Sequence, residues 1–412
     1  MREMKDSGIE WIGEFPKHWE ISKFKYAHFG LNVGESIDKE YWSDDDSDSI
    51  FYTAGLYPIR SSYNKFPHVK KTTLQDLLMS RNGTPYVYLP NEGALYTDHI
   101  IRAKIKDDWE RRYLSYCLQR SIEAEVVDTV SIATWSASIW NNQFIPAPNI
   151  DTQIQISDFL DSKCAEIDSI TADIQKEIEL LQEYRKSVIS EAVTKGLDSN
   201  VEMKDSGFQY WKTIPSNWTL ADIKYVFEIV KRIAGKEGFD VLAVTQKGIK
   251  IKDISNNEGQ IADSYTNYQL VFPGDFVMNH MDLLTGWVDC SCYFGVTSPD
   301  YRVFRLRNKK NCSNSYYKYV LQHCYSNKVF YSLGQGVSNL GRWRLQTDAF
   351  NEFLIPVPPM NEQESIAIYL DSKCSEIDSI IEDKQKQLDT LAEYRKSLIY
   401  EYVTGKKEVP AV

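Results

Sequence analysis

The chain has 412 residues, a formal net charge of −11, and 42% hydrophobic and 25% charged residues. This length exceeds one typical hydrophobic core, so we expect two or more domains. No apolar run approaches the roughly 18 residues that cross a bilayer, and no apolar N-terminal segment indicates a secretory signal. The seven scattered cysteines are typical of a reducing cytoplasm, and none has metal-site spacing. We therefore expect a cytoplasmic protein with no membrane segment and no metal site.

The opening of the chain occurs twice. The motif "MKDSG" stands at residues 4–8 and again at 203–207. Pro16 and Trp19 follow the first copy, and Pro215 and Trp218 follow the second copy at the same spacing. Internal repetition over most of a chain indicates two copies of one structural unit. The sequence is therefore predicted to contain two similar halves, each opened by this connector motif.

The end of each half is also repeated. "IPAPNIDTQIQISDFLDSKCAEIDSI" at 145–170 matches "IPVPPMNEQESIAIYLDSKCSEIDSI" at 355–380, and "EYRKS" follows both. The segments after the two Ile-Pro-x-Pro hinges lack proline and glycine and repeat apolar residues every seven positions, which predicts two long helices with a heptad seam. The seam, which Lys384 interrupts, is predicted to pack the two helices together, and its residues are Leu160, Ile167, Ile174, Leu181, Leu370, Ile377, Leu391 and Leu398.

Helix starts and helix pairing follow from the same segments. Asp151 is the expected cap of the first helix, and Asn361 with Glu364 resembles a capping box at the second. A single chain has to turn back between the two helices, so an antiparallel pair is predicted. Two separate amphipathic helices on globular cores are the alternative. Most of the acidic excess lies in these two segments.

The two variable domains, residues 20–143 and 219–353, differ from each other in sequence. Both mix short β-type runs and turn signals with one short amphipathic helix, which predicts α+β domains. We align residues 76–80 with 275–279, and 100–105 with 303–308. The predicted segments are 1–149 for the connector and first domain, 150–196 for the first helix, 197–359 for the second connector and domain, and 360–412 for the second helix.

Cationic and amide side chains gather at predicted loops of both domains and are candidate DNA contacts. Arginine can read guanine, asparagine can read adenine, and lysine more often holds phosphates. For any single residue, a solvated surface charge is the competing interpretation. The candidates are Lys70, Lys71, Arg81 and Asn82 in the first domain, and Lys247, Lys250, Asn279, His280, Asn339, Arg342 and Arg344 in the second.

The sequence contains no catalytic signature. It has no phosphate-binding loop, complete dinucleotide fingerprint, amino-methyltransferase motif, zinc-protease motif or nucleophile elbow. We therefore predict no catalytic residues and a non-enzymatic role.

The "KDSGIEWIGEFPKHW" opening with its repeat, the two hinges, "EQESIAIYLDSKCSEIDSI" and "EYRKSLIYEYVTGK" resemble the specificity subunit of type I restriction-modification enzymes over essentially the whole chain. The resemblance implies two α+β target-recognition domains separated by two long antiparallel coiled-coil helices, as a pseudo-two-fold internal repeat. Each domain would read one half of a bipartite, asymmetric site on double-stranded DNA. Two methyltransferase subunits, docked on the spacer formed by the seam residues, and restriction subunits would be the partners. S-adenosylmethionine, ATP and Mg would belong to those partners, with no cofactor in this chain.

Two other interpretations remain open from the residues alone. The net charge of −11 would suit an acidic DNA mimic that inhibits restriction. A non-catalytic protein scaffold would also be built from repeats. The repeat further predicts that the first connector lies beside the end of the second helix, near residues 402–407, so that the two termini are adjacent and Trp19 and Trp218 anchor the two joints.

Overall fold

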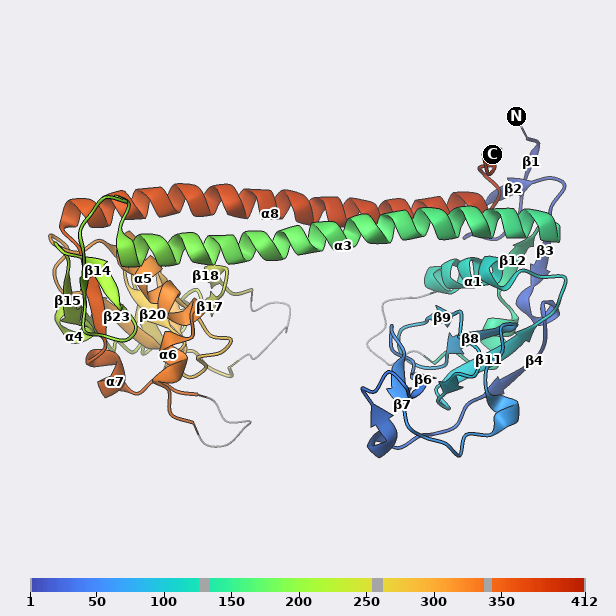
Figure 1. The fold of residues 1–412 in the computed structure, drawn as a ribbon, viewed down its shortest axis with the longest axis horizontal. Coiled ribbons are helices and arrows are strands. Elements are labelled where there is room, and N and C mark those ends of the chain that lie inside the picture. The colour runs from blue at the N-terminus through green and yellow to red at the C-terminus, as the bar shows by residue number, and fades with distance from the viewer. Residues whose placement is uncertain (1, 126–133, 254–261, 337–342, 411–412) are drawn as a thin grey trace. The chain divides into compact units, whose positions relative to one another are not determined.

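The computed structural model describes residues 2–125, 134–253, 262–336 and 343–410 (Figure 1). The chain divides into two compact units, unit 1 (Met1–Ile174 with Lys386–Val412) and unit 2 (Gln175–Gln385). Both long helices are divided between the units, so the units do not follow the predicted segments, and that segmentation stays a prediction. Within the described ranges, no helix combines the length and the apolar character needed to span a bilayer.

Unit 1 contains the first variable domain, which is built on a four-stranded antiparallel sheet in the order β4-β11-β8-β9. A second sheet, in the order β10-β6-β7-β5, has a parallel β10–β6 pair, and β1–β2 and β12–β3 form two-stranded sheets. The strands are β1 (Met4–Asp6), β2 (Glu14–Pro16), β3 (Glu20–Lys23), β4 (His28–Val33), β5 (Trp42–Ser43), β6 (Ser49–Tyr52), β7 (Ile59–Ser61), β8 (Asp76–Ser80), β9 (Val87–Tyr88), β10 (Leu95–Tyr96), β11 (Ile100–Ile105) and β12 (Phe144–Ala147). The helices are η1 (Phe24–Tyr26), η2 (Lys39–Tyr41), η3 (His68–Lys70), α1 (Arg111–Glu125) and α2 (Ala137–Asn141).

Unit 2 contains the second variable domain, whose main sheet has the order β16-β23-β20-β21. The pairs β13–β14, β15–β24, β17–β18 and β19–β22 are separate two-stranded sheets. The strands are β13 (Met203–Asp205), β14 (Thr213–Pro215), β15 (Thr219–Asp222), β16 (Phe227–Ile229), β17 (Leu242–Thr245), β18 (Gly248–Ile251), β19 (Gln269–Val271), β20 (Phe276–Met278), β21 (Val288–Cys290), β22 (Gly295–Thr297), β23 (Arg302–Leu306) and β24 (Leu354–Val357). The helices are α4 (Ile223–Val226), α5 (Asn314–Ser326), α6 (Val329–Ser332) and α7 (Thr347–Asn351).

The main sheets of the two domains share one topology, which confirms the predicted α+β class and the internal repeat. The sheet β4-β11-β8-β9 corresponds to β16-β23-β20-β21 in strand order and direction. The alignment of 100–105 with 303–308 is wrong by two residues. Ala103 stands opposite Leu77, and Phe304 stands opposite Phe276, so the pairing register makes Ala103 and Phe304 equivalent. The arginines in the two segments suggested the shifted alignment, but backbone pairing fixes the register.

The long helices are α3 (Ile150–Lys195) and α8 (Met360–Val403), and each unit contains part of both. In unit 1 the ring centres of Phe159 and Tyr402 lie 4.4 Å apart, while Asp168, further along α3, pairs at 3.6 Å with the earlier residue Arg395. In unit 2 the same reversed order joins Glu177 to Lys384 and Arg185 to Asp378. The two helices are therefore antiparallel within each unit, as predicted.

The predicted seam lies between these helices and against the domains. Leu160 and Leu370 are fully buried, and Leu181 and Leu391 are half-buried. The seam lysine, Lys384, is half-buried and is neutralised by its ion pair with Glu177. Burial of one apolar side chain per helical turn is the pattern of coiled-coil packing. The seam therefore serves the helix pair itself.

The predicted helix caps are wrong. Asn149 caps α3, because its Oδ1 accepts a hydrogen bond from the Thr152 amide at 2.9 Å. In α8 the Pro359 carbonyl accepts from the Gln363 amide at 3.0 Å, so Asn361 already lies inside the helix. Both helices begin directly after the hinge, because a proline's fixed backbone angle favours a helix start there.

The two connectors have the environments that the repeat predicts. Lys406 donates hydrogen bonds to the carbonyls of Ile12 and Glu14 at 2.9 and 2.7 Å. Arg2 pairs with Glu408 at 2.8 Å, so the two ends of the chain are adjacent within unit 1 (Figure 1). Trp19 is buried at this joint, confirming its predicted place.

The second connector matches the first. Trp218 is fully buried and donates its indole N–H to Glu362, in the first turn of α8, at 2.7 Å. Gly196, directly after α3, adopts φ +77° with its Cα against the Trp218 ring. Equivalent tryptophans, Trp19 and Trp218, therefore join the end of one helix to the start of a domain in the two halves.

Gly405→Ala should destabilise the closed joint. Gly405 has φ +68°, and a Cβ there would lie 2.6 Å from Pro16 Cγ and 2.8 Å from Trp19 Cη2. Left-handed backbone strain and overpacking together should cost about 2–5 kcal/mol. The control is Gly8→Ala, which has φ +67° and no atom within 4 Å, and should cost only about 1–2 kcal/mol. Urea denaturation followed by circular dichroism measures both, and equal losses would contradict the packing account.

Candidate nucleic-acid interface

In the first domain, a corner forms where β8 ends. The Trp140 indole N–H donates to the Ser80 carbonyl at 3.0 Å, which fixes the strand end. The Trp135 amide donates to the Arg81 carbonyl at 2.7 Å, and the Trp135 indole donates to the Gly83 carbonyl at 2.8 Å. The segment that returns at residues 134–135 is therefore held against the residues that follow β8. We call this arrangement of residues 80–83 with 134–135 the first corner.

The second domain contains the same junction. His280 follows β20 as Arg81 follows β8, and the Leu345 amide donates to the His280 carbonyl at 3.0 Å. Arg344 exchanges two main-chain hydrogen bonds with Gln335, at 3.0 and 3.1 Å. Residues 279–281 with 335 and 344–345 form the second corner. In both domains, main-chain hydrogen bonds build the corner.

The exposed side chains of the two corners differ. Arg81 is exposed in the first corner and donates to the Asp98 carbonyl at 3.3 Å, while Thr134 faces solvent from the returning segment. In the second corner the exposed guanidinium belongs to Arg344, on the returning segment itself. Each corner therefore presents one guanidinium, from a different position of the same frame.

The prediction that His280 serves as a surface contact is not supported by its environment. Burial and the nearby Arg302 and Arg344 together lower the pKa of His280 to about 4. The ring is therefore neutral near pH 7, and its buried Nδ1 makes no hydrogen bond. A neutral, half-buried imidazole cannot act as a cationic phosphate contact. His280 belongs to the support of the corner.

Two of the three predicted asparagines, Asn82 and Asn279, lie within the corners. The Asn82 side chain lies 3.4 Å from His99 Nδ1. Asn279 Oδ1 accepts from the Met281 amide at 3.3 Å, and Asn279 lines a cavity of about 380 Å³ together with Tyr265 and Tyr268. Asn339 and Arg342 lie outside the described residues, so their predicted role stays a prediction.

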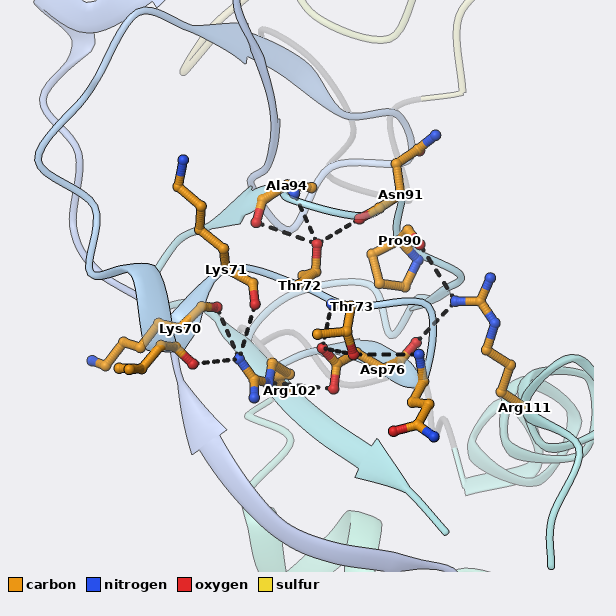
Figure 2. A network of polar contacts seen from close by, with 12 residues as sticks. Lys70, Lys71, Thr72, Thr73, Asp76, Pro90, Asn91, Ala94, Arg102 and Arg111 are labelled. Carbon is orange, nitrogen blue, oxygen red and sulfur yellow. Dashed lines mark hydrogen bonds and ion pairs between the residues drawn. The ribbon is translucent and has the colours of Figure 1, made fainter. Parts of the chain in front are cut away.

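Lys70 and Lys71 lie on a turn of the first domain that is fixed by Arg102 (Figure 2). The Arg102 Nη1 donates to the carbonyls of Val69, Lys70 and Lys71 at 3.2, 2.9 and 3.3 Å, and its Nε lies 3.4 Å from Asp76. Figure 2 shows the Lys71 ammonium pointing away from this network. Lys70 forms an ion pair with Glu35, which neutralises its charge. Lys71 is therefore the better candidate for a phosphate contact.

Lys247 and Lys250 lie on the β17–β18 hairpin of the second domain and are exposed. Asp289 braces this hairpin, because its Oδ2 accepts from the Ile249 amide at 3.2 Å. Burial raises the pKa of Asp289. Gly248 has φ +98°, and a Cβ there would lie 2.9 Å from Asp289 Oδ2. The hairpin can therefore hold two lysines in a fixed position for DNA phosphates.

Sequence reasoning missed the buried ion pairs beneath these loops. Asp76 pairs with Arg102, and the aligned Asp275 forms a two-pronged pair with Arg232 at 2.6 and 3.3 Å. The available signal was an aspartate at the same aligned position of both domains, next to an apolar strand. Because Arg232 is engaged in this pair, its charge is already neutralised.

The seam residues predicted to dock subunits do not form a surface. Their side chains are buried or half-buried within the chain, so a partner could not reach most of them. Other apolar residues of the helices are exposed, and four of these occupy matched positions of the two copies. These four are Ile170 and Ile380, and Tyr184 and Tyr394.

Comparisons with known proteins agree with this architecture. A family model described as the type I restriction modification DNA specificity domain matches residues 215–390. The type I restriction enzyme MjaVIII specificity subunit of Methanocaldococcus jannaschii is 26% identical over 81% of this chain and 79% of its own. The putative type I restriction enzyme MjaX specificity subunit of the same organism is 23% identical over 97% of this chain and 96% of its own.

A solved structure shares the fold. It comes from work on complex assembly and conformational transition of the type I restriction-modification system, with a TM-score of 0.66 at 11% identity over 95% of this chain and 99% of that one. The fold is therefore that of a duplicated chain with two similar domains. This chain is similar to type I restriction-modification specificity subunits over most of its length, and residues 215–390 match the DNA specificity domain of that family.

The salt dependence of DNA binding should separate the lysines. Lys247→Gln or Lys250→Gln should each make the negative slope of log affinity against log salt shallower by about 0.9. The reason is that DNA binding releases fewer counterions when one phosphate contact is lost. Lys70→Gln should leave the slope unchanged, because Glu35 already neutralises Lys70. Binding titrations at several salt concentrations measure this. Equal slopes for all three variants would contradict the assignment.

The affinity for DNA should not depend on protonation of His280 between pH 8 and pH 6. Its lowered pKa keeps the ring neutral at both pH 8 and pH 6, so no proton is gained in this interval. Wild type and His280→Gln should therefore change affinity in parallel between the two pH values. A gain at pH 6 that disappears in the variant would show that His280 binds DNA as a cation.

Proposed function

We propose that this chain is the non-catalytic specificity subunit of a type I restriction-modification complex and that its two domains read the two halves of a bipartite, asymmetric DNA site. The supporting observation is the repeated corner. The same main-chain junction carries Arg81 in one domain and Arg344 in the other, on different strands of the frame. Two readers with one frame and different side chains suit two unlike half-sites.

The helix pair suits the role of a spacer. With 44 residues, α8 is about 66 Å long at 1.5 Å per residue. Half-sites on one face of B-DNA recur every 34 Å or so. A flexible linker would let this distance fluctuate, whereas paired helices with a buried seam restrict it. Their acidic excess disfavours contact between the helices and DNA phosphates.

Partners would supply the chemistry. Two methyltransferase subunits would dock on matched surfaces of the two repeats, and restriction subunits would join them. The paired exposure of Tyr184 and Tyr394, at 55% and 54%, offers one aromatic residue per repeat for such docking. S-adenosylmethionine, ATP and Mg would be bound by these partners rather than by this chain.

Co-expression with a cognate methyltransferase subunit, followed by methylation mapping of genomic DNA, tests the function. We expect a bipartite motif with a fixed gap. Arg81→Ala should relax only the half read by the first domain, and Arg344→Ala only the other half. Loss of a bidentate contact should cost about 1–3 kcal/mol per base pair.

Other outcomes would contradict this proposal. Methylation of a continuous palindrome would exclude two independent readers. Inhibition of an unrelated type I methyltransferase would indicate a DNA mimic. An equal effect of both arginine variants on both halves would mean that these residues hold phosphates or stabilise the fold.

A further inference from the structure

The second corner rests on a buried arginine that the first corner lacks. Arg302 is 5% exposed and lies on β23 opposite Met278. The corresponding position in the first domain, opposite Met79, is Ile101. The strand register therefore places an additional cation beneath one corner only.

Arg302 holds the segment that presents Arg344. Its Nη2 donates to the Leu345 carbonyl at 3.1 Å and to Thr347 Oγ1 at 3.3 Å. Its guanidinium carbon lies 4.6 Å from the centre of the Phe350 ring, which packs against the flat face of the group. Leu345 also donates its amide to the His280 carbonyl. The backbone next to Arg344 is thus fixed from both sides.

The corner is rich in hydrogen-bond donors and poor in negative charge. None of the described carboxylates forms an ion pair with Arg302, and burial together with Arg344 lowers its pKa to about 10. Its Nη1 is buried without a hydrogen-bond partner, as is His280 Nδ1. A buried guanidinium without a carboxylate reduces stability, so a purely structural site would favour an apolar residue here. Its presence indicates a role in recognition.

The chemistry of the corner selects one base. Arginine carries only donors. In the major groove, guanine presents two adjacent acceptors, O6 and N7, whereas adenine and cytosine each present an amino group that a donor cannot approach favourably. A guanidinium presented from a fixed backbone, as that of Arg344 is, therefore matches guanine.

We propose that Arg302 is a positioning residue and that the corner it supports places Arg344 against O6 and N7 of a guanine in the second half of the DNA site. This inference rests on the proposed function of the two domains. It adds the identity of one base and the residue that holds its reader in place.

The test uses the full-length chain in complex with its methyltransferase subunits. Each guanine of the second half-site is replaced in turn by 7-deazaguanine, which lacks the N7 acceptor, and affinity is measured at fixed salt. Wild type should lose affinity about tenfold at one guanine. Arg344→Lys, which cannot make the two-pronged contact, and Arg302→Met should both lose most of this discrimination.

A matched control lies on the same strand. Arg305 is exposed and pairs with Glu228, so Arg305→Met should retain the wild-type discrimination. If Arg302→Met weakens binding to every probe equally and keeps the tenfold discrimination, Arg302 acts only on stability and the proposal is wrong.

Two further results would overturn the inference. One is a second half-site with no guanine that is sensitive to 7-deaza replacement. The other is sensitivity of the Arg344 contact to a methylphosphonate linkage, which removes a phosphate charge, instead of to 7-deazaguanine. A failure of the two-domain function itself is distinguishable, because genomic mapping would then yield no bipartite motif.

Discussion

The first and second corners depend on main-chain hydrogen bonds. Trp135 N–H to Arg81 C=O in one domain, and Leu345 N–H to His280 C=O in the other, close the same junction. A hydrogen bond between backbone groups requires no particular side chain at either residue. The residues at the junction are therefore free to differ while its geometry persists. In the proposed function, this separation of the frame from the exposed side chains would allow two domains of one fold to read different DNA sequences.

Buried arginines on the sheets hold neighbouring loops in place through hydrogen bonds. Arg102 and Arg302 both stand on the central strands β11 and β23, and both donate to carbonyls of segments far away in sequence. The groups that surround the two guanidinium charges differ. Arg102 lies beside the fully buried Asp76, whereas Arg302 has an aromatic ring and no carboxylate among the described residues. Because a donor-rich site favours an acceptor-rich ligand, this difference bears directly on what each domain can bind.

The sequence predicted the features that periodicity and repetition encode. Helix α3, helix α8, their seam and the joined termini all follow from local patterns that recur in both halves. It misassigned features that depend on residues brought together only by folding. Asn149, not Asp151, caps α3, because the hinge fixes where the helix starts. His280 seemed to be a surface cation, since nothing in the local sequence reveals that β23 places Arg302 behind it.

The two connectors are attached to the long helices in different ways. The second connector is covalently continuous with α3, whereas the first meets the end of α8 only through contacts. The Arg2–Glu408 pair is a weak substitute for a peptide bond, because Glu408 is 67% exposed and such pairs contribute about 1 kcal/mol or less. The larger contribution comes from burying Trp19 against Gly405, since full burial of a large apolar side chain is worth about 1.5–3 kcal/mol. A tryptophan packed on a glycine therefore stabilises both joints, and at the first joint it does so without a continuous backbone.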